Sequence, residues 1–161
     1  MIKSGAWLFF PAMAGVWALT GLSACHEAPE GTLEVHWMVN GGRTAAACTA
    51  AGVTTVRILT AHSGADPDPD PAHPTWPHQD FACGDLSGGF LVKEGIYRVR
   101  LVALDAGGAV RSGIVDFQGI QVVAGQVRSI PQNPVLESPV NLEVALCGDG
   151  VVQSGEWCDG E

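Results

Sequence analysis

The residues best suited to metal chemistry lie in one proline-rich segment, residues 62–80. Imidazole and carboxylate groups bind zinc and copper in proteins. Catalysis also requires such ligands to be held rigidly, and Trp76 is the only large hydrophobic residue in the segment. Alternating prolines remove backbone donors, so no regular element is expected here. We therefore favour a flexible acidic spacer over a transition-metal site. The candidate ligands are His62, His73, His78, Asp66, Asp68, Asp70 and Asp80.

Motifs for nucleophilic or phosphate chemistry are missing from the sequence. It contains no G-x-S-x-G elbow and no H-E-x-x-H pair, and no glycine-rich phosphate loop joins a strand to a helix. Ser63, Ser87 and their neighbouring glycines are typical of turns. The sequence therefore predicts a protein that is not an enzyme and that has no cofactor.

The first 24 residues have the features of a secretory signal. Lys3 supplies a positive charge, and residues 6–19 contain only apolar residues, glycine and proline. This run is shorter than the roughly 20 residues that a membrane span needs, and Pro11 interrupts it. The segment ends in Leu22-Ser23-Ala24-Cys25. Small residues at this place are typical of a cleavage site.

Leu22-Ser23-Ala24-Cys25 resembles the lipobox of bacterial lipoproteins. The resemblance implies that residues 1–24 are removed and that Cys25 carries the acyl chains that anchor the protein to a membrane. His26 follows the cysteine, and a residue other than aspartate there implies sorting to the outer membrane rather than the inner one. The alternative is an ordinary secretory signal with a cysteine near its cut site.

If Cys25 is acylated, an even number of cysteines remains: Cys48, Cys83, Cys147 and Cys158. An exported protein meets an oxidising environment in which disulfides persist. Four cysteines allow three connectivities. We favour Cys48–Cys83 and Cys147–Cys158 because each pair lies within its own segment. A four-thiolate zinc site is the rival interpretation, and the absence of a C-x-x-C pair disfavours it.

The charge of the chain excludes one class of partner. Seventeen acidic residues outnumber eight basic ones, for a formal net charge of −9. Binding to phosphate backbones requires clustered lysine or arginine, and here only Arg98 and Arg100 are close in sequence. We therefore expect no nucleic-acid partner. The expected partners are the membrane, through the lipid on Cys25, and another protein of the cell envelope.

Hydrophobic alternation predicts strands along most of the remaining chain. Leu33, Val35 and Trp37 alternate with polar residues, and Tyr97 opens a similar pattern over residues 96–104. Residues 105–108 form a hairpin turn signal, and residues 45–52 are consistent with one helical turn. Turn signals recur every 8–12 residues, which is typical of a β-sandwich. The full set of predicted strands is 32–39, 53–61, 96–104, 109–117, 120–123, 126–130 and 140–146, with apolar patches at 81–83 and 90–92.

Short motifs within residues 31–135 resemble known sandwich modules. Gly95-Ile96-Tyr97-Arg98-Val99-Arg100-Leu101, followed by Asp105-Ala106-Gly107-Gly108, is similar to a strand and hairpin of transthyretin-like and carboxypeptidase-regulatory-like domains. Residues 31–35, 48, 52–53 and 83–84 also resemble lipoprotein sandwich domains of myxobacteria. The resemblance implies an all-β, antiparallel sandwich of the immunoglobulin-like or transthyretin-like kind. Such modules usually present surfaces and seldom carry chemistry.

Residues 147–160 resemble the opening of a cysteine-rich repeat of myxobacterial surface proteins, C-G-D-G-x-x-x-x-G-E-x-C-D. Only half of such a repeat is present, which is consistent with one local Cys147–Cys158 loop. Calcium takes six to eight oxygen ligands, and Asp149, Glu156 and Asp159 are its candidates here. Their spacing does not match an EF-hand, and acids beside glycine in tight turns are usually solvated. We favour the solvated turn.

The sequence predicts four segments. These are a signal peptide (1–24), a lipidated tether (25–31), a β-sandwich (32–146) that contains the 62–80 loop, and a partial cysteine-rich repeat (147–161). We expect a non-catalytic, membrane-anchored surface lipoprotein that serves as a binding or structural module of the envelope. The alternative is a metal-dependent or carbohydrate-active accessory domain that uses the 62–80 loop.

Overall fold

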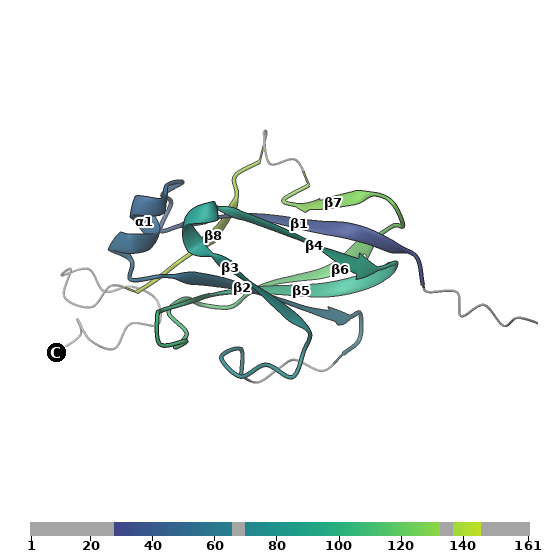
Figure 1. Ribbon diagram of the computed structural model, residues 1–161, viewed down its shortest axis with the longest axis horizontal. Coiled ribbons are helices and arrows are strands. Elements are labelled where there is room, and N and C mark those ends of the chain that lie inside the picture. Colours follow the sequence, from purple (N-terminus) through teal and green to yellow (C-terminus); the bar gives the residue numbers. More distant parts are fainter. Residues whose placement is uncertain (1–27, 66–69, 133–136, 146–161) are drawn as a thin grey trace, which may run out of the picture.

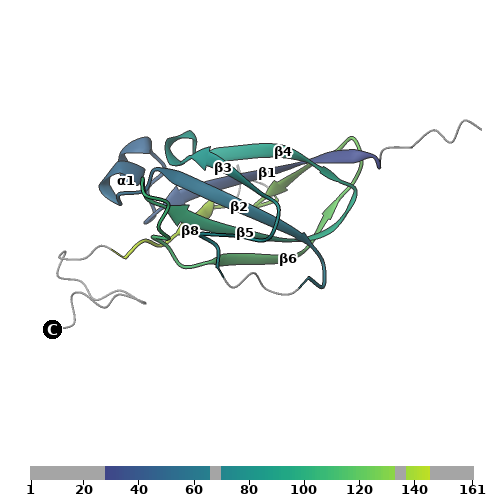
Figure 2. The same cartoon turned by 60° about the horizontal axis from the view of Figure 1, so that its bottom comes forward.

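Two β-sheets face each other across one hydrophobic core (Figures 1 and 2). The computed structural model describes residues 28–65, 70–132 and 137–145. In this part of the chain the first sheet has the order β4-β1-β7, with β8 also paired to β1, and the second has the order β3-β2-β5-β6. The prediction of an all-β sandwich is confirmed. The strands are β1 (Glu30–Val39), β2 (Thr55–His62), β3 (His78–Ala82), β4 (Ser87–Lys93), β5 (Gly95–Leu104), β6 (Val115–Val122), β7 (Val127–Ile130) and β8 (Val140–Leu142).

Strand β1 is the centre of the first sheet. One edge of β1 pairs antiparallel with β4, from Glu30 to His36. Its other edge pairs in parallel with two short strands in succession, β7 along residues 32–35 and β8 along residues 37–39. The pairings within the second sheet are all antiparallel. The first sheet is therefore mixed, although antiparallel pairing dominates the sandwich as a whole.

The alternation in the sequence places side chains as predicted. Leu33, Val35 and Trp37 of β1 are buried between the sheets. Across the core they meet residues such as Ile58 of β2 and Leu101 of β5. Successive side chains of a strand point to opposite faces, so one apolar set per strand lines the interior. The predicted helical turn at 45–52 is helix α1 (Ala45–Ala50), whose first turn is capped by Thr44.

Strand β6 differs from the sequence prediction. Segments 109–117 and 120–123 were expected to form separate strands, but one strand runs from Val115 to Val122. Tyr97 pairs with Ile120 and Val99 pairs with Phe117, so β6 holds one extra residue at this point. Gly119 has a φ of 69°, which lets the backbone accommodate the bulge. A bulge thus continues the strand where the sequence suggested a break.

The proline-rich loop is also more ordered at its C-terminal end than predicted. Strand β3 begins at His78, inside the segment expected to lack regular structure, and pairs with β2. It is an edge strand, and the carbonyl of Pro77 accepts a hydrogen bond from the Thr60 backbone N–H at 2.9 Å. Prolines are tolerated beside such a strand because the unpaired edge needs no backbone donors.

The strand directions define two ends of the sandwich. At one end, which we call the proximal pole, lie residues 29–32, 91–97 and 122–127. At the other, the distal pole, lie α1, the 40–42 turn and the 105–108 turn. Figure 1 shows β1 entering at the end opposite to α1. The backbone N–H of Val144 bonds to Oδ1 of Asn40 at 2.8 Å, so the last described residues also lie at the distal pole.

Candidate functional site

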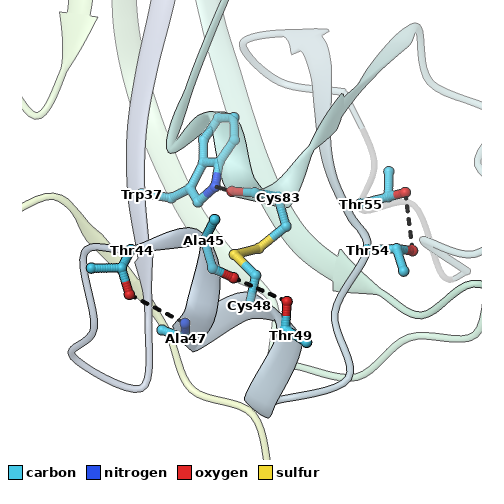
Figure 3. The surroundings of a disulfide bond; sticks show 9 residues. All are labelled: Trp37, Thr44, Ala45, Ala47, Cys48, Thr49, Thr54, Thr55 and Cys83. Atoms are coloured by element: carbon cyan, nitrogen blue, oxygen red, sulfur yellow. Dashed lines mark hydrogen bonds between the residues drawn. A yellow bond between two sulfur atoms is a disulfide. The ribbon is translucent and has the colours of Figure 1, made fainter.

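A disulfide joins α1 to the connection between β3 and β4 at the distal pole. Cys48 and Cys83 are paired, with Cα atoms 6.0 Å apart, and both side chains are buried. Figure 3 shows the indole of Trp37 beside this bond, where its Nε1 donates to the carbonyl of Cys83 at 2.9 Å. The predicted Cys48–Cys83 pair is confirmed. The bond links the segment that precedes β2 to the segment that follows β3, and the two segments contact each other at the distal pole.

Several predicted site residues lie outside the described part of the chain. They are Cys25, the predicted lipid attachment site, Cys147 and Cys158, the second predicted disulfide, and Asp149, Glu156 and Asp159, the calcium candidates. Asp66 and Asp68 of the proline-rich loop are also outside it.

The structure does not bring the three loop histidines together. His62 stacks on Tyr97, with ring centroids 4.8 Å apart. His73 pairs with Asp70, with Nδ1 and Oδ2 3.1 Å apart, and His78 lies with its Nδ1 3.2 Å from the carbonyl oxygen of Trp76. Among the described residues, no three histidine, cysteine, aspartate or glutamate side chains are grouped as metal ligands. The polar side chains in the described part of the loop are therefore isolated or paired, and they do not form a three-ligand metal site.

The same loop covers the outer face of the second sheet. Leu59, Val102 and Leu104 point away from the main core, and Trp76 packs on them to form a second buried cluster. The prediction of a flexible spacer is therefore wrong for residues 70–80. The physical reason is that β2 and β5 are apolar on both faces around Leu59 and Val102. Burying their outer face under the loop removes this apolar surface from water. The signal was present in the sequence as the unbroken apolar run Leu101-Val102-Ala103-Leu104.

Arg57 fixes the loop to the sheet through a second set of contacts. Its Nε and one terminal nitrogen donate to the two oxygens of Asp80, at 2.7 and 2.8 Å. The other terminal nitrogen donates to the carbonyl of Ala72 at 2.7 Å. This bidentate hydrogen bond lowers the pKa of the Asp80 carboxyl and raises that of Arg57. No local pattern in the sequence indicates this pair, because the register between β2 and β3 places the two residues opposite each other.

A polar cleft lies between this loop and the hairpin turn that follows β5. Its volume is about 530 Å³. The loop side contributes Arg57, Asp70 and His73, and the opposite side consists of residues 107–110. The hydrogen bond from His73 is the main cause that lowers the pKa of Asp70. These groups can donate and accept hydrogen bonds with a polar ligand. None of the described lining residues is a serine, threonine or cysteine that could act as a nucleophile.

A second cleft of about 540 Å³ lies at the proximal pole, between the ends of β2 and β4. Its lining is mainly apolar and includes Ala61, Leu91, Val92 and Tyr97. The Tyr97 hydroxyl donates to the carbonyl of Lys93 at 2.8 Å, and burial raises the pKa of this phenol. The two clefts therefore differ in chemistry and open at different parts of the sandwich.

Comparison with known proteins adds little to this picture. No protein family model and no curated protein matches the chain. A crystal structure of a leucine-rich repeat protein from Bacteroides thetaiotaomicron VPI-5482 is similar over 74% of this chain, with 12% sequence identity and a TM-score of 0.38. The similar region spans 13% of that protein. In the described part of this chain, no helix has the length and apolar character needed to cross a membrane.

Proposed function

We propose that this protein is an exported, lipid-anchored lipoprotein whose β-sandwich is a non-catalytic binding module of the cell envelope. The observation that carries the proposal is the buried Cys48–Cys83 disulfide. Such bonds form and persist in oxidising compartments and are rare in the cytosol. An oxidised domain that follows an N-terminal secretory signal is consistent with export.

The distance between the lipobox and the sandwich supports the anchor. The carbonyl of Pro29 accepts a hydrogen bond from the Glu94 N–H at 2.8 Å, so the sandwich begins four residues after Cys25. A chain so short serves as a tether and leaves no room for another folded unit between lipid and domain. His26 favours the outer membrane as the destination.

The polar cleft supports a role in binding. Arg57 and Asp70 provide opposite charges at one wall, and the backbone of residues 107–110 forms the other. It lies on the outer face of the second sheet, toward the distal pole. In this proposal the cleft contacts a polar group of an envelope partner, and it does so on the side away from the anchored end.

The N-terminus of the native protein tests the proposal. The full chain is expressed in a Gram-negative host in the presence of an alkyne-bearing fatty acid, and the mature N-terminal peptide is identified by mass spectrometry. We expect a peptide that begins at an acylated Cys25, together with recovery in the outer-membrane fraction. A Cys25→Ser variant is the control and is expected to take up no label. An intact Met1, or an unmodified Cys25, contradicts the proposal.

A further inference from the structure

Large apolar side chains gather at the proximal pole without being covered by the described part of the chain. Leu91 is 65% exposed, Val127 63%, Ile96 51% and Val123 36%. They come from β4, β7, β5 and the turn after β6, so their proximity is a product of the fold. Exposed apolar residues that gather at one end of a folded domain usually mark a contact with a partner or a membrane.

The strand register places these residues around the point where the tether leaves the domain. Thr32 of β1 pairs with Leu91 on one side and with Val127 on the other. Paired residues point to the same face of a sheet, so Leu91, Thr32 and Val127 form one row on the outer face. Ile96 lies on the outer face of the opposite sheet, at the same end. The apolar side chains therefore lie on both sides of the pole.

The backbone at this pole is held in place by hydrogen bonds. The Gly125 N–H donates to the carbonyl of Glu30 at 2.8 Å, and the Glu94 side chain accepts from the Ala124 N–H at 3.2 Å. Together with the bond from Glu94 N–H to the carbonyl of Pro29, these contacts tie the turns at 93–95 and 123–126 to the start of β1. The tether thus joins a fixed surface.

The length of the tether identifies what covers this surface. Cys25 and Pro29 are four residues apart, and even a fully extended chain spans only about 14 Å over that distance. With a lipid on Cys25, the pole cannot move beyond the reach of the headgroups. We propose that the proximal pole rests on the membrane and that Leu91, Ile96, Val123 and Val127 insert into the interface. This inference rests on the proposed lipid anchor.

The charges at the pole specify the kind of lipid surface. Glu30, Lys93 and Glu94 are exposed there, so the pole carries more negative than positive charge. An acidic rim does not attract anionic headgroups, and apolar insertion is insensitive to salt. This charge balance therefore fits a zwitterionic surface, such as one rich in phosphatidylethanolamine. The contact is expected to persist at high ionic strength.

Photochemical labelling from the lipid tests this orientation. The full-length protein, processed by the expressing Gram-negative host and purified from its detergent-solubilised membranes, is reconstituted into vesicles of phosphatidylethanolamine and phosphatidylcholine that contain a diazirine-bearing phosphatidylcholine. Adducts are mapped by mass spectrometry after irradiation. We expect labelling in peptides that contain residues 91–96 and 123–127. Val110 and Ile114 are internal controls, since they are 37% and 45% exposed but lie toward the distal pole, and we expect them to stay unlabelled.

A matched pair of variants checks the role of the side chains. Leu91→Ser with Val127→Ser is expected to reduce the adduct yield about fivefold or more, and Val110→Ser with Ile114→Ser to leave it unchanged. Flotation of the protein with vesicles is measured on each sample. Flotation is expected in every case, because the lipid on Cys25 supplies the anchor.

The outcomes separate the two proposals. A protein that does not float with the vesicles lacks the anchor, which overturns the proposed function and this inference with it. A protein that floats but is labelled equally at both poles, or only at Val110 and Ile114, overturns this inference alone. Irradiated cross-links between two copies through the proximal pole, in place of lipid adducts, also overturn it, because a second copy then covers the surface.

Discussion

The guanidinium of Arg100 lies over the indole ring of Trp76, with Cζ 5.0 Å from the ring centroid. Arg100 belongs to β5 in the second sheet, and Trp76 belongs to the proline-rich loop. Such a cation–π contact adds to the apolar packing of the same ring on Leu59, Val102 and Leu104. The loop is therefore part of the folded domain, and both Trp76 and Arg57 attach it to the second sheet.

Replacing Trp76 with alanine is expected to destabilise the protein by about 3 kcal/mol, since removal of a buried aromatic ring typically costs 3–5 kcal/mol and this ring lies at the surface of a small cluster. The measurement is equilibrium unfolding in urea, with hydrogen exchange of residues 70–80. Trp76→Phe is the control, and it is expected to keep most of the stability. If alanine at 76 changes neither stability nor exchange, the loop is not held by this ring.

The Cys48–Cys83 bond closes a loop over a sequence separation of 35 residues. Replacing both cysteines with alanine is expected to lower the free energy of unfolding by about 3.5–4 kcal/mol in the chain-entropy model. Denaturant unfolding of the oxidised proteins measures this loss. A Cys147→Ala, Cys158→Ala variant is the parallel control and is expected to lose less, because the loop that the predicted Cys147–Cys158 pair would close is shorter. The opposite ranking would contradict the expectation.

Acidic pH is expected to weaken the second sheet at Asp116. Nε of Arg98 donates to both oxygens of this carboxyl at 2.9 and 3.0 Å, and Arg100 lies 3.4 Å away. The hydrogen bond from Arg98 is the main cause that lowers the pKa of Asp116 in the folded state. A lowered folded pKa means that the unfolded state binds the proton first. The contribution of the Asp116 carboxylate to the free energy of unfolding is thus complete above the unfolded pKa of about 3.9. It is lost as the pH falls through the lower pKa of the folded state.

Unfolding free energies of the wild type and of Asp116→Asn, measured from pH 7 to pH 2, test this expectation. The wild type is expected to lose stability below about pH 4, and the variant is expected to show a shallower decline. Asp80→Asn serves as a comparison, because the pKa of Asp80 is lowered in the same way by Arg57. A variant that follows the wild-type curve at every pH would show that the Arg98 pair contributes nothing.

Gly31 is expected to tolerate no side chain. A Cβ atom there would clash with the carbonyl oxygen of Val123 and would lie 2.7 Å from a methyl carbon of Val122. Gly31→Ala is therefore expected to destabilise the protein by about 1–3 kcal/mol, as overpacking commonly does. Gly113→Ala is the matched control, because nothing lies within 4 Å of a Cβ at that position. Thermal unfolding compares the two, and equal melting temperatures would contradict the close approach.

Metal binding by the loop histidines is a further measurable point. The three histidines each contact a different neighbour and do not converge on one point. Treatment with the chelator EDTA is therefore expected to leave the melting temperature unchanged. Elemental analysis of the purified protein and thermal unfolding with and without EDTA provide the test. Stoichiometric zinc or copper that is lost in a His73→Ala, His78→Ala variant would favour a metal-dependent role.

Local patterns in the sequence predicted the strands that enclose the main hydrophobic core. The alternation at 32–39 and at 96–104 predicted which side chains of β1 and β5 point inward, because a strand exposes opposite faces to water and to the core. The cysteines also suggested the Cys48–Cys83 pair from their positions alone. The alternation depends on neighbouring residues alone, whereas the cysteine pair was one choice among three connectivities; both predictions were confirmed.

Tertiary structure decided the features that depend on residues far apart in the chain. The cover that Trp76 provides, the bidentate contact of Arg57 with Asp80 and the gathering of Leu91, Ile96, Val123 and Val127 at one pole all follow from strand order and register. A sequence pattern shows that a face is apolar but not which distant segment covers it. That choice is made by competition among all the surfaces that the folded chain brings together.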